Sequence, residues 1–116
     1  MTPNKNLLSG STTLLVLSLL AQGDRYGYEM IAALDAKSDH TFALKEGTLY
    51  PILHTLEKDG AVRAYDKAAP SGKQRRYYHL TKKGETLLRE QKEAWISFSQ
   101  TVTAIVTEGA APVFAL

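Results

Sequence analysis

The chain has 116 residues, of which 44% are hydrophobic and 22% are charged, and it contains no cysteine. This composition is typical of one small folded domain and excludes a disordered or fibrous chain. The missing thiols exclude a disulfide scaffold, a zinc ribbon and a cysteine nucleophile, which makes the cytoplasm the expected compartment. The net charge of +2 does not by itself indicate a nucleic-acid partner, so the distribution of charge along the chain is more informative about the partner than its total.

The first predicted helix spans Leu7 to Gln22, where apolar residues lie almost all round the helical wheel. Its longest apolar run, Leu14 to Ala21, is far shorter than the roughly 20 residues that a membrane span needs. We therefore expect a buried helix and no membrane partner. The residues before it show no cleavage site, so no signal peptide is expected.

A second helix is predicted within residues 24–38, because Tyr26, Met30, Ile31 and Leu34 form one apolar stripe. Gly23 and Asp24 separate it from the first helix. The residues after it, 40–44, predict a short extended connector with room for one strand.

The third predicted helix lies between Gly47 and Gly60, and its apolar face consists of Leu49, Ile52, Leu53 and Leu56. Pro51 fits the first turn of a helix, where the N–H groups have no intrahelical acceptor. Two starts remain open, one with Thr48 as the cap and one nearer Glu46. Gly60 is the expected end.

The opposite face of this helix carries small and polar residues instead of alternating glutamate and lysine. Its members are Gly47, Pro51, His54 and Lys58, flanked by Tyr50 and Thr55. A solvated helix usually carries pairs of opposite charge there, so this face is suited to close approach by a partner.

A β-hairpin is predicted next, from β-prone runs at 61–65 and 75–80 joined by Pro70, Ser71 and Gly72. Leu80, Tyr78 and Arg76 are expected on its inner face, and Arg75, Tyr77 and His79 on its outer face. The tip is basic, because Lys73, Arg75, Arg76, Lys82 and Lys83 follow Gly72 with no acidic residue between them.

Thr81 is the predicted cap of a long last helix, which Gly109 and Pro112 are expected to end. Its seam has the 3-4 spacing of a coiled coil and consists of Leu88, Gln91, Trp95, Phe98, Val102 and Ile105. We expect a second copy of the chain to pack there, mainly on Leu88, Trp95, Phe98, Val102 and Ile105. The predicted organisation is a winged helix-turn-helix domain at residues 1–80, a dimerisation helix at 81–108 and a tail at 109–116.

The predicted fold is mainly α with a small β-hairpin: a winged helix-turn-helix plus a long C-terminal dimerisation helix. Over residues 7–106 the sequence resembles the PadR-like transcriptional regulators. The resemblance is carried by YGYEM in the second helix, EGTLYPILHTLEKDG in the third, GKQRRYYHLTKKG from the hairpin into the last helix, and Trp95 followed by Phe98. The single short C-terminal helix resembles the small-chain branch, which includes multidrug-sensing members.

The predicted function is a homodimeric repressor that binds a palindromic operator in double-stranded DNA. The major groove is about 12 Å wide and admits one helix, so small residues at the start of the third helix suit close approach. The residues expected to contact DNA are Tyr28, Lys45, Gly47, Thr48, Tyr50, Pro51, His54, Lys58, Lys73, Arg75 and Arg76. The role of Tyr28, a phosphate contact, is implied by the resemblance, and packing between helices is its alternative. Tyr50 has a similar alternative at the edge of the core.

Trp95 has two interpretations. It packs in the core or in the interface or, as the resemblance to multidrug-sensing members implies, it stacks on a flat aromatic effector together with Gln91 and Phe98. No catalytic constellation is found, so an enzyme is not expected. The three histidines, His40, His54 and His79, have no metal-site spacing, and neither a metal nor another cofactor is expected. The rival function is a winged-helix protein-interaction module that binds no DNA.

Overall fold

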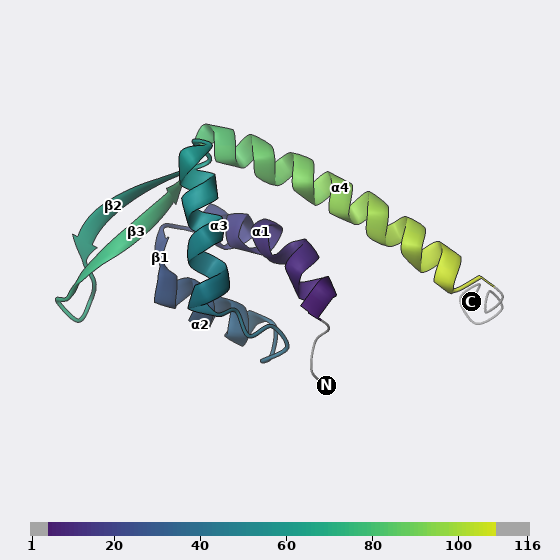
Figure 1. The fold of residues 1–116 in the computed structure, drawn as a ribbon, viewed down its shortest axis with the longest axis horizontal. Helices are drawn as coiled ribbons and strands as arrows, with labels where there is room; N and C mark the ends of the chain where they lie inside the picture. Colours follow the sequence, from purple (N-terminus) through teal and green to yellow (C-terminus); the bar gives the residue numbers. More distant parts are fainter. Residues whose placement is uncertain (1–4, 109–116) are drawn as a thin grey trace.

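The structure, a computed structural model, describes residues 5–108. Its helices are α1 (Lys5–Ala21), α2 (Gly27–Lys37), α3 (Glu46–Lys58) and α4 (Lys82–Val106), and its strands are β1 (Arg25–Tyr26), β2 (Val62–Ala68) and β3 (Gln74–Leu80). Figure 1 shows α1, α2 and α3 grouped together, with the β2–β3 hairpin extending from one side and α4 from the other. The predicted fold, a winged helix-turn-helix followed by a long helix, is confirmed.

One hydrophobic core joins the three helices to the inner face of the sheet. Leu17 of α1, Met30 of α2, Leu53 of α3 and Tyr78 of β3 are almost completely inaccessible to solvent. Burying a leucine or methionine side chain contributes about 1.5 to 3 kcal/mol, so this cluster is the main source of stability for the domain. The apolar stripe predicted for the third helix points inward as expected, and Met30 and Leu34 of α2 lie in the same core.

The sheet has the order β1-β3-β2 and is antiparallel throughout. Its third strand is Arg25–Tyr26, a segment that the sequence placed in the second helix, whereas residues 41–44 form no strand. The helix pattern extended too far because Tyr26 continues the apolar spacing of α2, yet Tyr26 caps α2 with an extended backbone and pairs with Tyr77. In the connector, Leu44 is buried in the core. The connector therefore packs against the domain through this side chain without pairing in the sheet.

Helix α3 takes the earlier of the two starts that the sequence left open. Lys45 is its N-cap, Leu49 N donates to the Lys45 carbonyl at 2.9 Å, and Thr48 lies inside the first turn instead of capping it. Pro51 is consequently the sixth helical residue and has no N–H to donate to the carbonyl of Gly47, four residues earlier. The helix ends at Lys58, before Gly60, as predicted.

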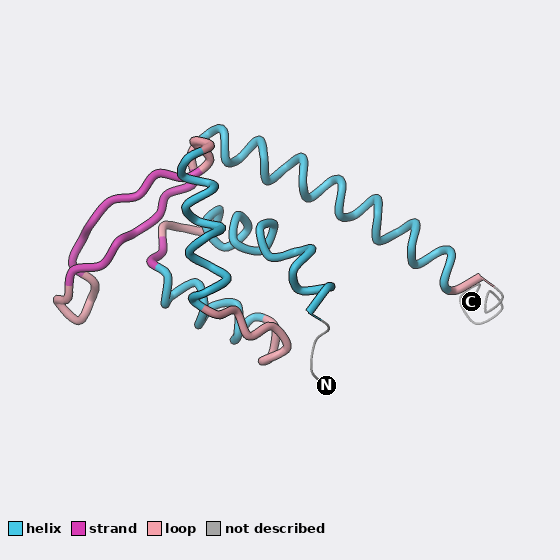
Figure 2. Tube along the Cα trace, in the orientation of Figure 1, coloured by secondary structure: helices cyan, strands magenta, loops and turns pink. Residues whose placement is uncertain are grey.

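The hairpin has longer strands than predicted, and residues 69–73 connect strand β2 to strand β3 (Figure 2). Tyr78 and Leu80 face the core, as expected for the inner face. Tyr77, which was assigned to the outer face, is nevertheless only 4% exposed. The reason is that Tyr26 of β1 and Tyr65 of β2 lie beside it in the register and cover its ring.

Helix α4 is joined tightly to the domain at its first turn. The Thr81 hydroxyl accepts a hydrogen bond from Gly84 N at 3.1 Å, which confirms the predicted cap, and donates to the Gly60 carbonyl at 2.6 Å. A Cβ atom at Gly84 would collide with the carbonyl oxygen of Ala61, so only glycine permits this approach. The helix ends at Val106, while Gly109, Pro112 and the tail lie outside the described residues.

Candidate nucleic-acid interface

The outward face of α3 is a continuous exposed surface. The residues predicted to contact DNA on and before this helix are exposed with one exception, and the exposed ones are Lys45, Gly47, Thr48, Pro51, His54 and Lys58. The apolar residues of the same helix, Leu49, Leu53 and Leu56, are buried on the other side. Packing of α3 on the core therefore presents the predicted contact residues to solvent together.

Two residues on this face disfavour the helix that contains them. Glycine in a helix costs about 0.5 to 1 kcal/mol relative to alanine, and proline at an interior position removes a backbone hydrogen bond. A Cβ atom at Gly47 would meet nothing within 4 Å, so packing within the chain does not require glycine there. Residues that break a local rule without a packing reason are expected at functional surfaces.

Tyr50 is the exception, because it is half-buried and packs against the core. Its phenol lies against Gly27 at the start of α2, so closely that a Cβ atom at Gly27 would collide with it. Tyr50 thus occupies the core edge that the sequence offered as its alternative position, and its contact with DNA stays a prediction. Tyr28, in the first turn of α2, is 65% exposed and does not pack between helices.

The β2–β3 hairpin is the wing, and the outer face of the sheet carries a row of three tyrosines, one from each strand: Tyr26 of β1, Tyr77 of β3 and Tyr65 of β2. The Tyr26 and Tyr77 ring centroids are 5.3 Å apart in an edge-to-face arrangement, and those of Tyr65 and Tyr77 are 5.7 Å apart in a stacked one. Such pairs favour a fixed ring geometry. Burial raises the pKa of the Tyr77 phenol. The row packs one side chain from each of the three strands against its neighbours.

Two cations lie over the tyrosine row. Lys67 Nζ is 4.7 Å from the centroid of Tyr77, and the Arg75 guanidinium carbon is 5.4 Å from that of Tyr26. These are cation–π distances. Arg75 is one of the predicted DNA contacts. Its Nε atom is buried without a hydrogen-bond partner, so the guanidinium lies close to the sheet. Lys73, at the tip, is exposed.

Arg76 projects from the inner face of the wing toward α3. Its Nη2 atom is 3.2 Å from Glu57 Oε2 in the last turn of α3. The pKa of Arg76 is raised, first by a hydrogen bond with the Tyr78 phenol and then by the charge of Glu57. Lys73, Arg75 and Arg76 therefore lie in three different surroundings: the exposed tip, the tyrosine row and this ion pair.

Asp24 is a residue that the sequence interpretation did not single out. Its carboxylate accepts a hydrogen bond from the Tyr65 hydroxyl at 2.6 Å, and its other oxygen lies 2.8 Å from His79 Nδ1. Burial opposes ionisation of Asp24, but the bonds from Tyr65 and His79 outweigh it and leave its pKa below the usual value. The sequence pattern did not reveal strand β1, which follows Asp24 directly. The pairing of β1 with β3 would have been needed to place Asp24 beside the wing.

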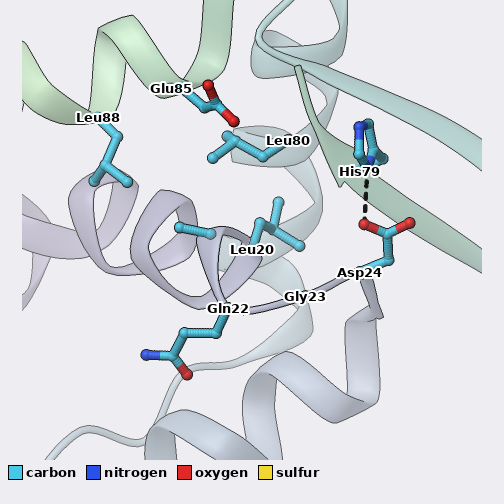
Figure 3. Close-up of a pocket in the computed structure, with 9 residues that line it drawn as sticks. Leu20, Gln22, Gly23, Asp24, His79, Leu80, Glu85 and Leu88 are labelled. Atoms are coloured by element: carbon cyan, nitrogen blue, oxygen red, sulfur yellow. Dashed lines mark hydrogen bonds and ion pairs between the residues drawn. The ribbon is translucent and has the colours of Figure 1, made fainter. Parts of the chain in front are cut away.

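A pocket of about 280 Å³ lies where the wing, α1 and α4 meet. Figure 3 shows Glu85 and Leu88 reaching into it from α4, Leu20 from α1, and the bonded Asp24 and His79 at one side. The predicted effector residues Gln91, Trp95 and Phe98 are not among the residues that line it. Of the α4 seam only Leu88 reaches this pocket, so the structure does not place the predicted effector residues in it within one chain.

The seam of α4 is largely uncovered. Leu88 packs partly against the core, but farther along the helix Trp95 is 40%, Phe98 63% and Ile105 63% exposed. The Trp95 and Phe98 ring centroids are 6.3 Å apart. Large apolar side chains on one exposed stripe mark an interaction surface.

The part of the chain that the structure describes contains no group of three or more histidine or acidic residues placed to hold a metal ion. Within the same residues, none of the helices is both long and apolar enough to cross a membrane.

Comparisons with known proteins agree with this geometry. The family model described as the transcriptional regulator PadR-like family matches residues 16–90. A transcriptional regulator from Clostridium thermocellum has a similar structure, with a TM-score of 0.80 and 31% identity, covering 88% of this chain and 99% of the other. A PadR-like regulator from Bacillus cereus gives 0.77 and 34%, covering 88% and 97%.

A shorter similarity extends to a transcriptional regulator from Mycobacterium tuberculosis, 39% identical over 57 residues, which are 49% of this chain and 52% of that protein. The relatives that carry a functional name are thus transcriptional regulators. The exposed α3 face, the basic wing, the long last helix and the match over residues 16–90 lead to one assignment. The chain belongs to the PadR-like family of transcriptional regulators.

Proposed function

We propose that this regulator is a sequence-specific DNA-binding repressor that acts as a homodimer in the cytoplasm. The observation that carries the proposal is the exposed face of α3, on which Gly47 and Pro51 disfavour the helix without serving the core. Small residues at the start of a recognition helix allow its backbone to approach the floor of the major groove. His54 and Lys58 then donate to base edges or phosphates.

The wing supplies the sequence-independent part of the binding. Lys73 presents positive charge at the exposed tip, and Arg75 presents it over the tyrosine row, on the face of the sheet opposite the Arg76–Glu57 pair. Contacts to phosphates fix orientation and add affinity for every sequence, whereas contacts to bases select one. Tyr28, exposed in the first turn of α2, adds a further phosphate contact.

The homodimer forms through α4. The stripe of Trp95, Phe98, Val102 and Ile105 is exposed in the single chain, and covering it with the same stripe of a second chain buries it in a self-complementary way. Two α3 helices then enter successive major grooves about 34 Å apart, which requires a palindromic operator.

A flat aromatic effector releases the repressor in this proposal. The paired Trp95 rings, with Phe98 and Gln91 beside them, border a gap at the dimer seam because large aromatic rings pack less completely than leucines. An effector that prefers one dimer geometry changes the spacing of the two α3 helices, and such coupling is typically worth about 1 to 3 kcal/mol. Quenching of Trp95 fluorescence by planar aromatic compounds tests this step.

Selection of bound duplexes from a random DNA pool tests the function. The expected result is enrichment of a palindromic sequence whose affinity falls steeply with added salt, with a slope of about 0.9 for each phosphate neutralised. Failure to enrich any sequence, together with binding that is insensitive to salt, would contradict DNA binding and favour a protein-interaction module instead.

A further inference from the structure

One wing cation is separated from the others by its acidic surroundings. Arg76 lies 3.2 Å from Glu57 of α3, and Asp66 is its direct partner in the antiparallel register of β2 and β3. Cross-strand partners share one face of the sheet, so Asp66 lies on the same face as Arg76, the face that Glu57 of α3 approaches. Arg76 is thus next to two negative charges, one from each neighbouring element.

Other basic residues of the proposed interface have different surroundings. Lys58 and Lys73 are exposed, and neither belongs to the ion pairs found within residues 5–108. Arg75 and Lys67 lie over tyrosine rings on the opposite face of the sheet. A phosphate that approached Arg76 would also meet Glu57 and Asp66, whose repulsion opposes the attraction of the guanidinium.

We propose that Glu57 is a positioning residue that keeps Arg76 out of the DNA phosphate contacts and thereby limits sequence-independent binding. The inference rests on the proposed DNA-binding function. The pair connects the last turn of α3 to β3 and adds no net charge to the interface. Each phosphate contact strengthens binding to all sequences alike, so withholding one lowers the affinity for unrelated DNA.

The experiment measures binding of the intact chain to an unrelated duplex over a series of salt concentrations. It compares the wild type with Glu57→Gln, Arg76→Gln and the double variant. Asp59→Asn is the matched control, because it removes the same charge two residues along the chain from an exposed residue outside the ion pairs of residues 5–108. Circular dichroism establishes that each variant is folded.

Glu57→Gln frees Arg76, and the expected result is about five- to tenfold tighter binding at 0.1 M salt, with a salt slope steeper by about 0.9. Arg76→Gln alone leaves two carboxylates unneutralised and should weaken binding several-fold at an unchanged slope. The double variant should return both quantities to the wild-type values within about twofold, because it removes the cation and its main partner together. Asp59→Asn should leave the slope unchanged.

Two results would overturn the inference. One is a Glu57→Gln variant with the wild-type affinity and slope. The other is a double variant whose slope is shallower than that of the wild type by about 0.9, because that loss means that Arg76 neutralises a phosphate in the native complex. A wild-type protein that binds no duplex would overturn the proposed function along with it, whereas wild-type binding with either result above overturns this inference alone.

Discussion

The winged-helix domain and the outer half of α4 differ in how far their apolar side chains are exposed to solvent. In the domain, Leu17, Met30 and Leu53 are completely buried by α1, α2, α3 and the sheet. In α4 beyond Leu88, Phe98 and Ile105 are each 63% exposed. The domain buries its apolar side chains in its own core, whereas the apolar stripe of α4 is not covered by the rest of the described chain. The difference indicates that folding of the domain and the proposed association through α4 depend on different residues, so substitutions can test each of them separately.

The largest effect is expected from Phe98→Asp, which places a charge in the α4 seam. The side chain is exposed in the single chain, so the domain should fold normally, while the dimer should dissociate because the charge would be buried in it. Losing the second half-site should weaken operator binding by about 100-fold or more.

Sedimentation equilibrium and fluorescence anisotropy measure the two consequences of Phe98→Asp. Ser97→Asp is the control, since it adds the same charge to the same helix at an exposed position outside the seam. A Phe98→Asp protein that remains dimeric at micromolar concentration would contradict the role given to α4.

The next effect concerns the domain itself. In Gly84→Ala the new methyl group collides with the Ala61 carbonyl oxygen and lies 2.5 Å from Leu80 Cδ1. Overpacking of this kind costs about 1 to 3 kcal/mol, more than the gain in helix propensity, so we expect a lower free energy of unfolding. Gly47→Ala, where the methyl group meets nothing within 4 Å, should instead stabilise the fold by about 0.5 to 1 kcal/mol. Urea unfolding distinguishes them, and equal effects would refute the packing at Gly84.

A smaller effect is expected on DNA binding from single contacts. His54→Ala and Lys58→Ala remove exposed side chains of α3, so operator affinity should fall by about tenfold with unchanged thermal stability.

Replacing Lys73 at the wing tip should lower the affinity for all duplexes alike and reduce the salt slope. Anisotropy titrations with the operator and an unrelated duplex measure both. A loss at Lys73 restricted to the operator would contradict its role as a phosphate contact.

The smallest effect is expected from Asp24, which joins the wing to the end of α1. Its pKa is lower in the folded chain than its ordinary value of 3.8, so its stabilising contribution is present above that value and is lost as the pH falls through the folded pKa. The difference in unfolding free energy between the wild type and Asp24→Asn should therefore shrink between about pH 5 and pH 3. Tyr65→Phe should reproduce part of this change. A difference that is constant over the range would exclude the linkage.

The sequence predicted those parts of the fold that depend on local periodicity. The stripe of Leu49, Leu53 and Leu56 is a property of one helix, and the Thr81 cap is a property of one turn, so both could be identified without tertiary information. The strand Arg25–Tyr26 could not, because two residues have no periodicity and their strand conformation depends on pairing with Tyr77 and Tyr78. The burial of Tyr77 follows from the same pairing.

The candidate site divides in a similar way. The exposure of His54 and Lys58 follows from the helical wheel of α3, and the structure agrees. The different surroundings of Arg75 and Arg76, neighbours in the sequence, depend on what lies on each face of the sheet: Tyr26 on one and Glu57 on the other. The basic run between Gly72 and Lys83 indicated charge at the wing, but contacts between distant residues determine where that charge is available.

The stoichiometry of the complex with a selected operator duplex tests the central claim most directly. Analytical ultracentrifugation of labelled duplex with excess protein measures how many chains bind one site. We expect two chains on each palindromic operator and a large loss of affinity when one half-site is scrambled. One chain for each site, with an affinity that does not depend on the second half-site, would contradict a dimer that presents two α3 helices to DNA.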